Sequence, residues 1–378
     1  MAPADGSPPI ILEPSLDLRP VPDAVPAERR RGRGAGLNMA SRYDNQRTEA
    51  VDDGWTQEEA PPLRTEIAVD QSRSVLARNT SPDVPFDRSV NPYRGCEHGC
   101  VYCFARPSHA QLGMSPGLDF ETKLVIKPRA PALLAEALRK PGYSVRPIAI
   151  GTNTDPYQPI ERQHRIMRGV LEVLEAHAHP VWVTTKGASI TDDLDILGRM
   201  GRRGLAQVTL SLTTLDSRLS RDLEPRAASP GRRLAAVRAL ADAGVPVKVN
   251  LAPVIPGLTD HEIEALLEAA AAAGATAAHY TVLRLPLEVA ALFRDWLTRE
   301  RPERAKRVLS LVRDVHGGRD YDPAWHKRLK GEGVHASLIA RRFDLACRRY
   351  GLAPDLADLR TDLFAPPPRP GDQLSLGF

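Results

Sequence analysis

Short apolar runs alternate with longer amphipathic segments from about residue 85 to residue 285. The amphipathic segments have helical period, and the apolar positions between residues 166 and 174, for example, share one helix face. Six apolar runs predict strands at Val90–Tyr93, Ile148–Thr152, Val181–Lys186, Val208–Thr213, Val247–Val254 and His279–Leu285. This α/β alternation predicts a parallel sheet with right-handed crossovers, which either curls into an incomplete barrel or lies flat.

The rest of the pattern divides the chain into further parts. Residues 1–78 are rich in proline and carry an arginine run within residues 29–33. This composition predicts a flexible arm that is either solvated or in contact with nucleic-acid phosphates. Residues 79–285 form the predicted α/β unit. Residues 286–352 are expected to be a helical extension, and residues 353–378 a flexible, proline-rich tail.

Composition favours an ordinary globular protein, with 42% hydrophobic and 26% charged residues. No stretch approaches the roughly 20 apolar residues of a membrane helix, and the N-terminus lacks a signal pattern. We therefore expect a cytoplasmic protein without a membrane partner. The net charge of +4 is compatible with nucleic acid as a partner, although many enzymes with other substrates are as basic.

Three of the four cysteines, Cys96, Cys100 and Cys103, fall within eight residues. Clustered thiols in a reducing compartment indicate a metal rather than disulfides. The segment follows a predicted strand and therefore lies at the C-terminal end of the sheet, where α/β barrels place their chemistry. Gly95 and Gly99 let the backbone bend closely around an iron–sulfur cluster. Three thiolates leave the fourth iron of such a cluster without a protein ligand, and catalysis requires an open position of this kind.

A structural zinc site is the alternative, with His98 or His109 as the fourth ligand. Zinc ligands usually come as two separated pairs, whereas these cysteines form one compact triplet. The fourth cysteine, Cys347, lies far away in the sequence, and we expect it to be a buried free thiol.

The Cys-x3-Cys-x2-Cys spacing, with the aromatic Tyr102 before the third cysteine, resembles the motif of radical S-adenosylmethionine (SAM) enzymes. Residues 91–96, 151–159 and 252–257 resemble the spore photoproduct lyase-like branch, often labelled DNA repair photolyases. The resemblance implies a partial (βα)6 TIM-like barrel, a [4Fe-4S] cluster on the three cysteines, and SAM bound to the open iron and cleaved to a 5′-deoxyadenosyl radical.

The resemblance also implies partners and a substrate class. A flavodoxin or ferredoxin would supply the electron, and the radical would act on DNA or a nucleotide component in a lyase-like repair reaction. Two alternatives stay open at this point. The same radical could modify RNA or a protein, or the chain could be a non-catalytic, metal-stabilised module that binds nucleic acid or the bacterial sliding clamp.

Polar residues at strand ends are candidate SAM ligands. The resemblance carries over Asn153 and Asp155 for the ammonium group, and Lys186 and Ser211 for the carboxylate and ribose. It also places the backbone of Tyr102 against the adenine. Each residue has an ordinary alternative, because an aspartate before proline is common in turns and a lysine at a strand end is usually solvated.

The chain departs from the family pattern in one respect. Spore photoproduct lyases carry a further cysteine downstream of the cluster, which returns a hydrogen atom to the substrate. No cysteine lies between Cys103 and Cys347 here, so repair of the spore thymine lesion by that route is not expected. Tyr143, Tyr157 and Tyr280 are candidates for a substitute hydrogen donor.

The last six residues resemble the peptide by which bacterial polymerases and repair proteins bind the sliding clamp. Gln373 would form hydrogen bonds at the edge of the clamp's pocket, while Leu376 and Phe378 would fill apolar pockets. The preceding prolines would provide reach. The alternative is an ordinary frayed terminus, because short motifs recur by chance.

Overall fold

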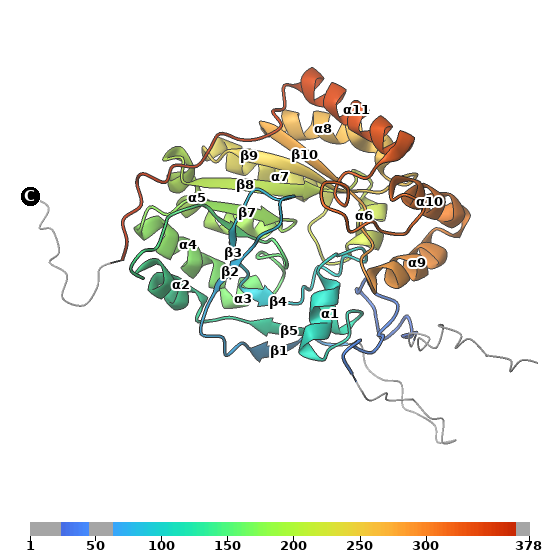
Figure 1. Cartoon of the computed structure of the whole chain (residues 1–378), viewed down its shortest axis with the longest axis horizontal. Helices are drawn as coiled ribbons and strands as arrows, with labels where there is room; N and C mark the ends of the chain where they lie inside the picture. The colour runs from blue at the N-terminus through green and yellow to red at the C-terminus, as the bar shows by residue number, and fades with distance from the viewer. Residues whose placement is uncertain (1–23, 45–62, 368–378) are drawn as a thin grey trace, which may run out of the picture.

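The computed structural model describes residues 24–44 and 63–367, and within these residues the main sheet has seven strands. Its order is β10-β9-β8-β7-β6-β3-β2, and the six strands from β3 to β10 are mutually parallel, whereas β2 is antiparallel to β3. This topology confirms the predicted βα units (Figure 1). The strands are β2 (Leu76–Arg78), β3 (Arg88–Val90), β6 (Ile148–Ile150), β7 (Val181–Thr185), β8 (Ala206–Leu212), β9 (Val247–Val254) and β10 (Ala277–Val282).

The sheet is curled rather than flat. Side chains alternate along each strand, so that Val181 and Val183 of β7 join the buried core while Trp182 and Thr184 line an interior cavity. Strands β6 to β10 all contribute to this cavity, and the sheet ends at β2 and β10 without closing. The expectation of an incomplete barrel is thus confirmed. The helices that follow its strands are α2 (Ala130–Leu138), α3 (Glu161–His164), α4 (Ile166–Ala176), α5 (Leu194–Arg202), α6 (Ser217–Leu223), α7 (Pro230–Asp242) and α8 (Ile263–Ala272).

A second, three-stranded sheet of order β1-β5-β4 stands beside the barrel, and the sequence pattern did not predict it. It comprises β1 (Glu66–Val69), β5 (Lys123–Ile126) and β4 (Tyr93–Arg94), with α1 (Asp119–Thr122) next to β5. Three short 3-10 helices complete the described elements of the α/β unit: η1 (Arg106–Leu112), η2 (Ala188–Asp193) and η3 (Asp260–Glu262).

The structure corrects the assignment of residues 1–78 to a flexible arm. Within its described part, β1 pairs with β5, β2 pairs with β3, and Ala35 is fully buried. Arg33, expected to be solvated or to contact phosphate, is buried and donates to the carbonyl oxygen of Glu121 at 2.7 Å. The composition misled because this segment is held by strand pairing and buried polar contacts rather than by a run of apolar residues.

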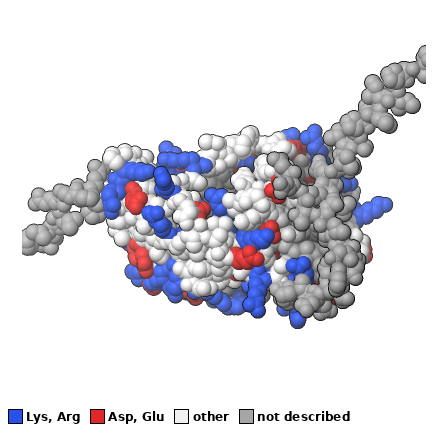
Figure 2. Space-filling view, turned by 90° about the horizontal axis from the view of Figure 1, so that it is seen from below, with Lys and Arg blue, Asp and Glu red and all other residues white. Residues whose placement is uncertain are grey.

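The segment predicted to be a helical extension contains α9 (Val289–Glu300), α10 (Pro302–Val315) and α11 (Gly333–Tyr350). Helix α11 packs on α8, and α10 contacts both α9 and α11. Among the described residues, no helix has both the length and the apolar character needed to span a membrane. On the face shown in Figure 2, Lys and Arg cover more of the described surface than Asp and Glu, in keeping with the net charge of +4.

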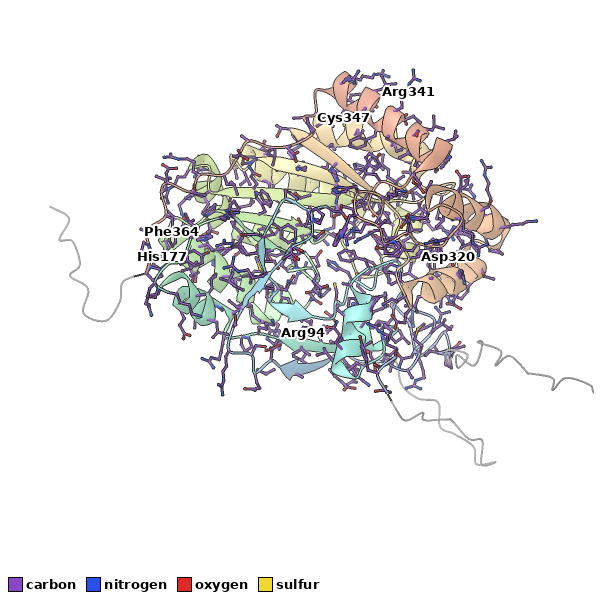
Figure 3. The ribbon with its side chains drawn as sticks, in the orientation of Figure 1. Arg94, His177, Asp320, Arg341, Cys347 and Phe364 are labelled. Carbon is purple, nitrogen blue, oxygen red and sulfur yellow. The ribbon has the colours of Figure 1, made fainter. Side chains whose placement is uncertain are left out.

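Residues 352–366 form a segment that we call the C-terminal strap, and they correct the prediction of a flexible tail from residue 353. The strap crosses the ends where the barrel strands begin. Its Ala353 accepts from the amide of Ala278 at 2.9 Å, and the amide of Arg360 donates to Gly204 at 2.9 Å. The amide of Ala365 donates to His177 at 3.0 Å, so that the strap ends beside the loop before β7, where Figure 3 labels His177 and Phe364. Gln373, Leu376 and Phe378 lie outside the described residues.

Candidate functional site

The three clustered cysteines lie on the loop after β4 and line one wall of a cavity of about 770 Å³. Gly95 and Gly99 adopt φ angles of +74° and +69°, a conformation that side-chain-bearing residues rarely adopt. A Cβ atom at Gly95 would also lie 2.9 Å from the carbonyl oxygen of Phe120. The prediction that glycines allow a tight bend at this loop is therefore confirmed.

Buried polar groups hold the cysteine loop from behind. Arg106 is fully buried, forms an ion pair with Glu121 at 2.5 Å and donates to the carbonyl oxygen of Cys100 at 2.9 Å. Glu121 also accepts from the amides of Gly34 and Ala35, each at 2.9 Å. One carboxylate thus fixes the N-terminal segment to the cysteine loop. The sequence carried no signal for this role, because the contact joins residues far apart in the chain.

Burial disfavours the charged form of the three cysteine thiols. Burial raises the pKa of all three cysteines, and the charge of Asp155 raises that of Cys96 further. Thiolates at such a site need nearby positive charge, which a metal supplies. Among the described residues, no group of three or more His, Cys, Asp or Glu is placed to ligate a single metal ion. A four-iron cluster does not require the three thiolates to converge on one ion, because each thiolate binds its own iron.

The two histidines of the zinc alternative do not join the cysteines in a group that could hold one metal ion, among the residues that the structure describes. His98 lies 3.3 Å from a carboxylate oxygen of Asp155, and the ring of His109 packs edge-on against Phe120 with centroids 5.5 Å apart. Burial lowers the pKa of His109, which keeps that ring neutral. His109 Nε2 is buried without a hydrogen-bond partner among the described residues, and its ring is held by packing against Phe120.

Asp155 joins the strand ends to the cysteine loop. It accepts from the Thr185 hydroxyl at 2.5 Å, from the Lys186 amide at 2.7 Å and from the Tyr157 amide at 2.9 Å. Burial alone would raise the pKa of Asp155, but His98 and these donors hold it below its ordinary value. Asp155 is therefore a charged anchor that faces the cavity, and its role toward the SAM ammonium group stays a prediction.

Glu224, the residue after α6, organises the wall next to Lys186. It is fully buried and accepts from the hydroxyls of Tyr102 and Thr213, and its second oxygen pairs with Arg233. The Lys186 ammonium lies 3.6 Å from Glu224 and donates to the carbonyl oxygen of Ala252 at 3.0 Å. Burial would raise the pKa of Glu224, but Arg233 and Lys186 lower it to about 2. The sequence placed Tyr102 and Lys186 at the cavity, but it did not indicate the carboxylate that connects them.

The cavity continues down the barrel between polar, inward-facing side chains. Asn153 and Ser211 line it, although their roles toward SAM stay predictions, and Ser211 of β8 is in register with Asn250 of β9. Asn250 Oδ1 and Trp182 Nε1 are buried and have no hydrogen-bond partner among the described residues. Buried polar atoms of this kind point to a ligand, because leaving them unpaired is costly. The period-two alternation of β7 and β9 could have indicated both residues.

Residues 90–270 match the family model of the radical SAM superfamily. An uncharacterized protein of Mycobacterium tuberculosis is 38% identical over 260 residues, which cover 68% of this chain and 75% of that relative. The chain belongs to the radical SAM superfamily. An uncharacterized protein of Methanocaldococcus jannaschii is 25% identical over 173 residues, which cover 46% of this radical SAM chain and 62% of that relative.

Solved structures show the same radical SAM fold. Spore photoproduct lyase complexed with dinucleoside spore photoproduct matches with a TM-score of 0.57 and 15% identity, covering 79% of this chain and 86% of the lyase. A mutant lyase with bound SAM and dinucleoside spore photoproduct matches with a TM-score of 0.52 and 17% identity, covering 75% of this chain and 77% of the mutant lyase. At these identities the likeness establishes the fold.

The three tyrosines considered as hydrogen donors do not line the cavity of this radical SAM barrel. Tyr157 donates to Asp193 at 3.0 Å, Tyr143 pairs with His179 at 2.8 Å, and Tyr280 packs against a ring of α11. All three point into packed layers outside the barrel interior, which argues against the proposed role. Cys347 is buried on α11, away from the cysteine loop, as expected (Figure 3).

Proposed function

We propose that this radical SAM protein holds a [4Fe-4S] cluster with Cys96, Cys100 and Cys103 and uses SAM to act on DNA or a nucleotide component. The observation that carries the proposal is that three thiols on one loop share a cavity with the polar ends of the barrel strands. A binding module has no need for such a cavity, which favours an enzyme over the non-catalytic alternative.

The residues around the cavity fit both groups. The glycine bends leave the three thiols on one wall, and Lys186, Asn153 and Ser211 offer a cation and polar groups to a zwitterionic methionyl moiety. When bound, the reduced cluster and SAM together supply a 5′-deoxyadenosyl radical that abstracts hydrogen from the substrate.

The chain's own groups position and shield the reactants. Glu224 fixes Lys186 and the Tyr102 hydroxyl, so that the Tyr102 backbone is held for contact with adenine. Asp155 keeps the end of β7 next to the cysteine loop. Asp355 and Asp358 of the C-terminal strap line the opposite end of the cavity, and the strap thereby restricts entry of water from that side.

The substrate class is inferred from the fold and the surface charge. The lyase with the same fold is described as complexed with a dinucleoside spore photoproduct, which supports a nucleotide substrate for this chain. The missing downstream cysteine argues for a substrate other than the spore thymine lesion, or for another route of hydrogen return. A flavodoxin or ferredoxin is the electron donor that we propose.

Anaerobic purification tests this function. We expect a brown protein with about four irons per chain, which is the content of one cubane cluster, and release of 5′-deoxyadenosine when dithionite and SAM are added. Cys96→Ala, Cys100→Ala and Cys103→Ala should each abolish the release, because each removes one of only three cluster ligands. Cys347→Ala is the matched control and should retain it. Colourless, zinc-loaded protein, or full activity in any of the first three variants, would refute the assignment.

A further inference from the structure

Two exposed aromatic rings, one lining the cavity and one on a neighbouring segment, are each paired with an arginine. Phe104 directly follows Cys103, its side chain is 46% exposed, and the Arg284 guanidinium lies 4.4 Å from its ring centroid. Trp325 is 51% exposed, and the guanidinium of Arg328 lies 4.3 Å from its ring centroid. We call Phe104, Arg284, Trp325 and Arg328 the aromatic rim.

The two pairs lie on neighbouring segments. The amide of Val282, the last residue of β10, donates to the carbonyl oxygen of Leu329 at 2.9 Å, so the chain around Arg328 runs beside the end of β10. Arg284 follows two residues later and lines the cavity together with Phe104 and Leu329. Phe104 and Arg284 therefore border the cavity beside the cysteine loop, and Trp325 and Arg328 lie on the adjoining segment that contributes Leu329 to the cavity lining.

The rim carries positive charge that the chain does not fully neutralise. Arg328 is paired with Asp83 and donates to Ser81. In contrast, no carboxylate of the described residues lies within ion-pair distance of Arg284. A phosphate brought by a ligand would find a guanidinium at Arg284 that is not paired with any described carboxylate.

Rings and cations in this arrangement match one kind of ligand. Each ring has an arginine on one side and retains exposed surface for a second planar group, while the guanidinium groups attract phosphate. A strand with unstacked bases offers both, whereas a base-paired duplex hides the faces of its bases.

We propose that the aromatic rim binds single-stranded or locally unstacked nucleic acid, with bases against Phe104 and Trp325 and a phosphate near Arg284. The inference rests on the proposed function in taking the adjoining cavity as the active site. It goes beyond that function because it specifies that the bound nucleic acid is single-stranded or unstacked and names the residues that recognise it.

Fluorescence anisotropy with the full-length, cluster-loaded protein tests the rim. The probes are a labelled DNA single strand of about 12 nucleotides, a length that stacking grooves can cover, its duplex, and the RNA single strand of the same sequence. We expect both single strands to bind at least about tenfold more tightly than the duplex, since base stacking on an aromatic ring is worth a factor of this size.

Variants separate stacking from charge. Trp325→Ala should weaken single-strand binding about tenfold, while Trp325→Phe, which keeps a ring, should retain most of it. Arg284→Gln should weaken binding and reduce its salt dependence. Arg341→Ala, which removes an exposed arginine on α11 (Figure 3), is the charge control and should bind as the wild type does.

Equal binding of duplex and single strand, unchanged binding in Trp325→Ala, or no binding of any probe would overturn the proposal. The wild-type preparation is also assayed for 5′-deoxyadenosine release in the absence of nucleic acid. Release without strand binding refutes the rim alone, whereas absence of release refutes the proposed function. The two failures are therefore distinguishable.

Discussion

A single carboxylate, Glu224, balances a buried cation, Arg233, and a partly buried one, Lys186, at the cavity wall. It pairs with Arg233 on one side and lies 3.6 Å from Lys186 on the other. Removal of one partner of a buried charge network leaves the other charges uncompensated, which costs far more than the loss of a surface pair. The position of Lys186 in the cavity thus depends on a residue that need not touch SAM.

Glu224→Gln should lower the free energy of unfolding by about 3–5 kcal/mol, the usual result of breaking a buried ion pair. Urea denaturation measures the change. Glu175→Gln, which breaks an exposed pair with Arg199, is the matched control and should cost less than about 1 kcal/mol. An equal, small effect in both variants would contradict the role assigned to Glu224.

The pH dependence of this effect has a definite sign. The folded-state pKa of Glu224 is lowered from 4.5 to about 2, so the carboxylate stabilises the folded state above its unfolded pKa and loses that contribution as the pH falls toward 2. The stability difference between wild type and Glu224→Gln should therefore be constant between about pH 5 and 8 and shrink at lower pH.

At this scale the sequence could identify only residues with local signals. The thiols stand in one short motif, and Lys186 and Ser211 follow from the ends of predicted strands. Glu224 and Glu121 gain their roles from contacts between segments distant in the chain, and no local pattern reports such contacts. The sequence did not indicate which side of the sheet the three candidate tyrosines occupy. In the structure their side chains contact Asp193, His179 and Phe343 and do not line the cavity.

At the scale of elements, the N-terminal segment supports the cysteine loop. A Cβ atom at Gly34 would overlap the carbonyl oxygen of Gly99, so the two backbones are in direct contact. The adjoining amides of Gly34 and Ala35 donate to Glu121, which also holds Arg106. The segment thus fixes the backbone on which the thiols stand.

Gly34→Ala should push the segment off the loop, because the atom it meets is backbone and cannot rotate away. We expect a loss of about 1–3 kcal/mol in stability, as in other overpacked sites, and faster loss of the cluster's visible absorbance in air. Gly231→Ala is the control, since nothing lies within 4 Å of the added carbon there, and its stability should be unchanged or slightly raised. Equal rates of cluster loss in the two variants would contradict the supporting role.

Elements with regular patterns were predictable, whereas elements held by their neighbours were not. The six parallel strands follow from apolar runs that pack under helices. Strand β1 is exposed along its whole length and is held by its pairing with β5. Its sequence therefore lacks the alternation of apolar and polar residues that predicts a strand. The C-terminal strap likewise depends on backbone bonds to the barrel, which composition alone does not reveal.

At the scale of the whole molecule, the two ends of the barrel have different tasks. The cysteine loop and the aromatic rim lie where the strands end, and the C-terminal strap closes the side where they begin. The strap is anchored by Leu359, which is buried, and by Phe364, whose ring packs against His179 and Tyr143. Residues 373–378 follow the strap in the sequence and lie outside the described residues, so their binding to a clamp stays a prediction.

Two truncations separate the strap from the tail. A chain that ends after Pro367 should keep the unfolding temperature and 5′-deoxyadenosine release of the full chain but lose binding to the bacterial sliding clamp, because Gln373, Leu376 and Phe378 are removed. A chain that ends after Gly351 should in addition lose at least about 2 kcal/mol of stability, since it exposes apolar surface under Leu359 and Phe364. Calorimetry and fluorescence polarisation against purified clamp measure the two effects. Clamp binding that survives the shorter deletion, or Gln373→Ala and Phe378→Ala chains that bind as the full chain does, would refute the tail as the clamp-binding segment.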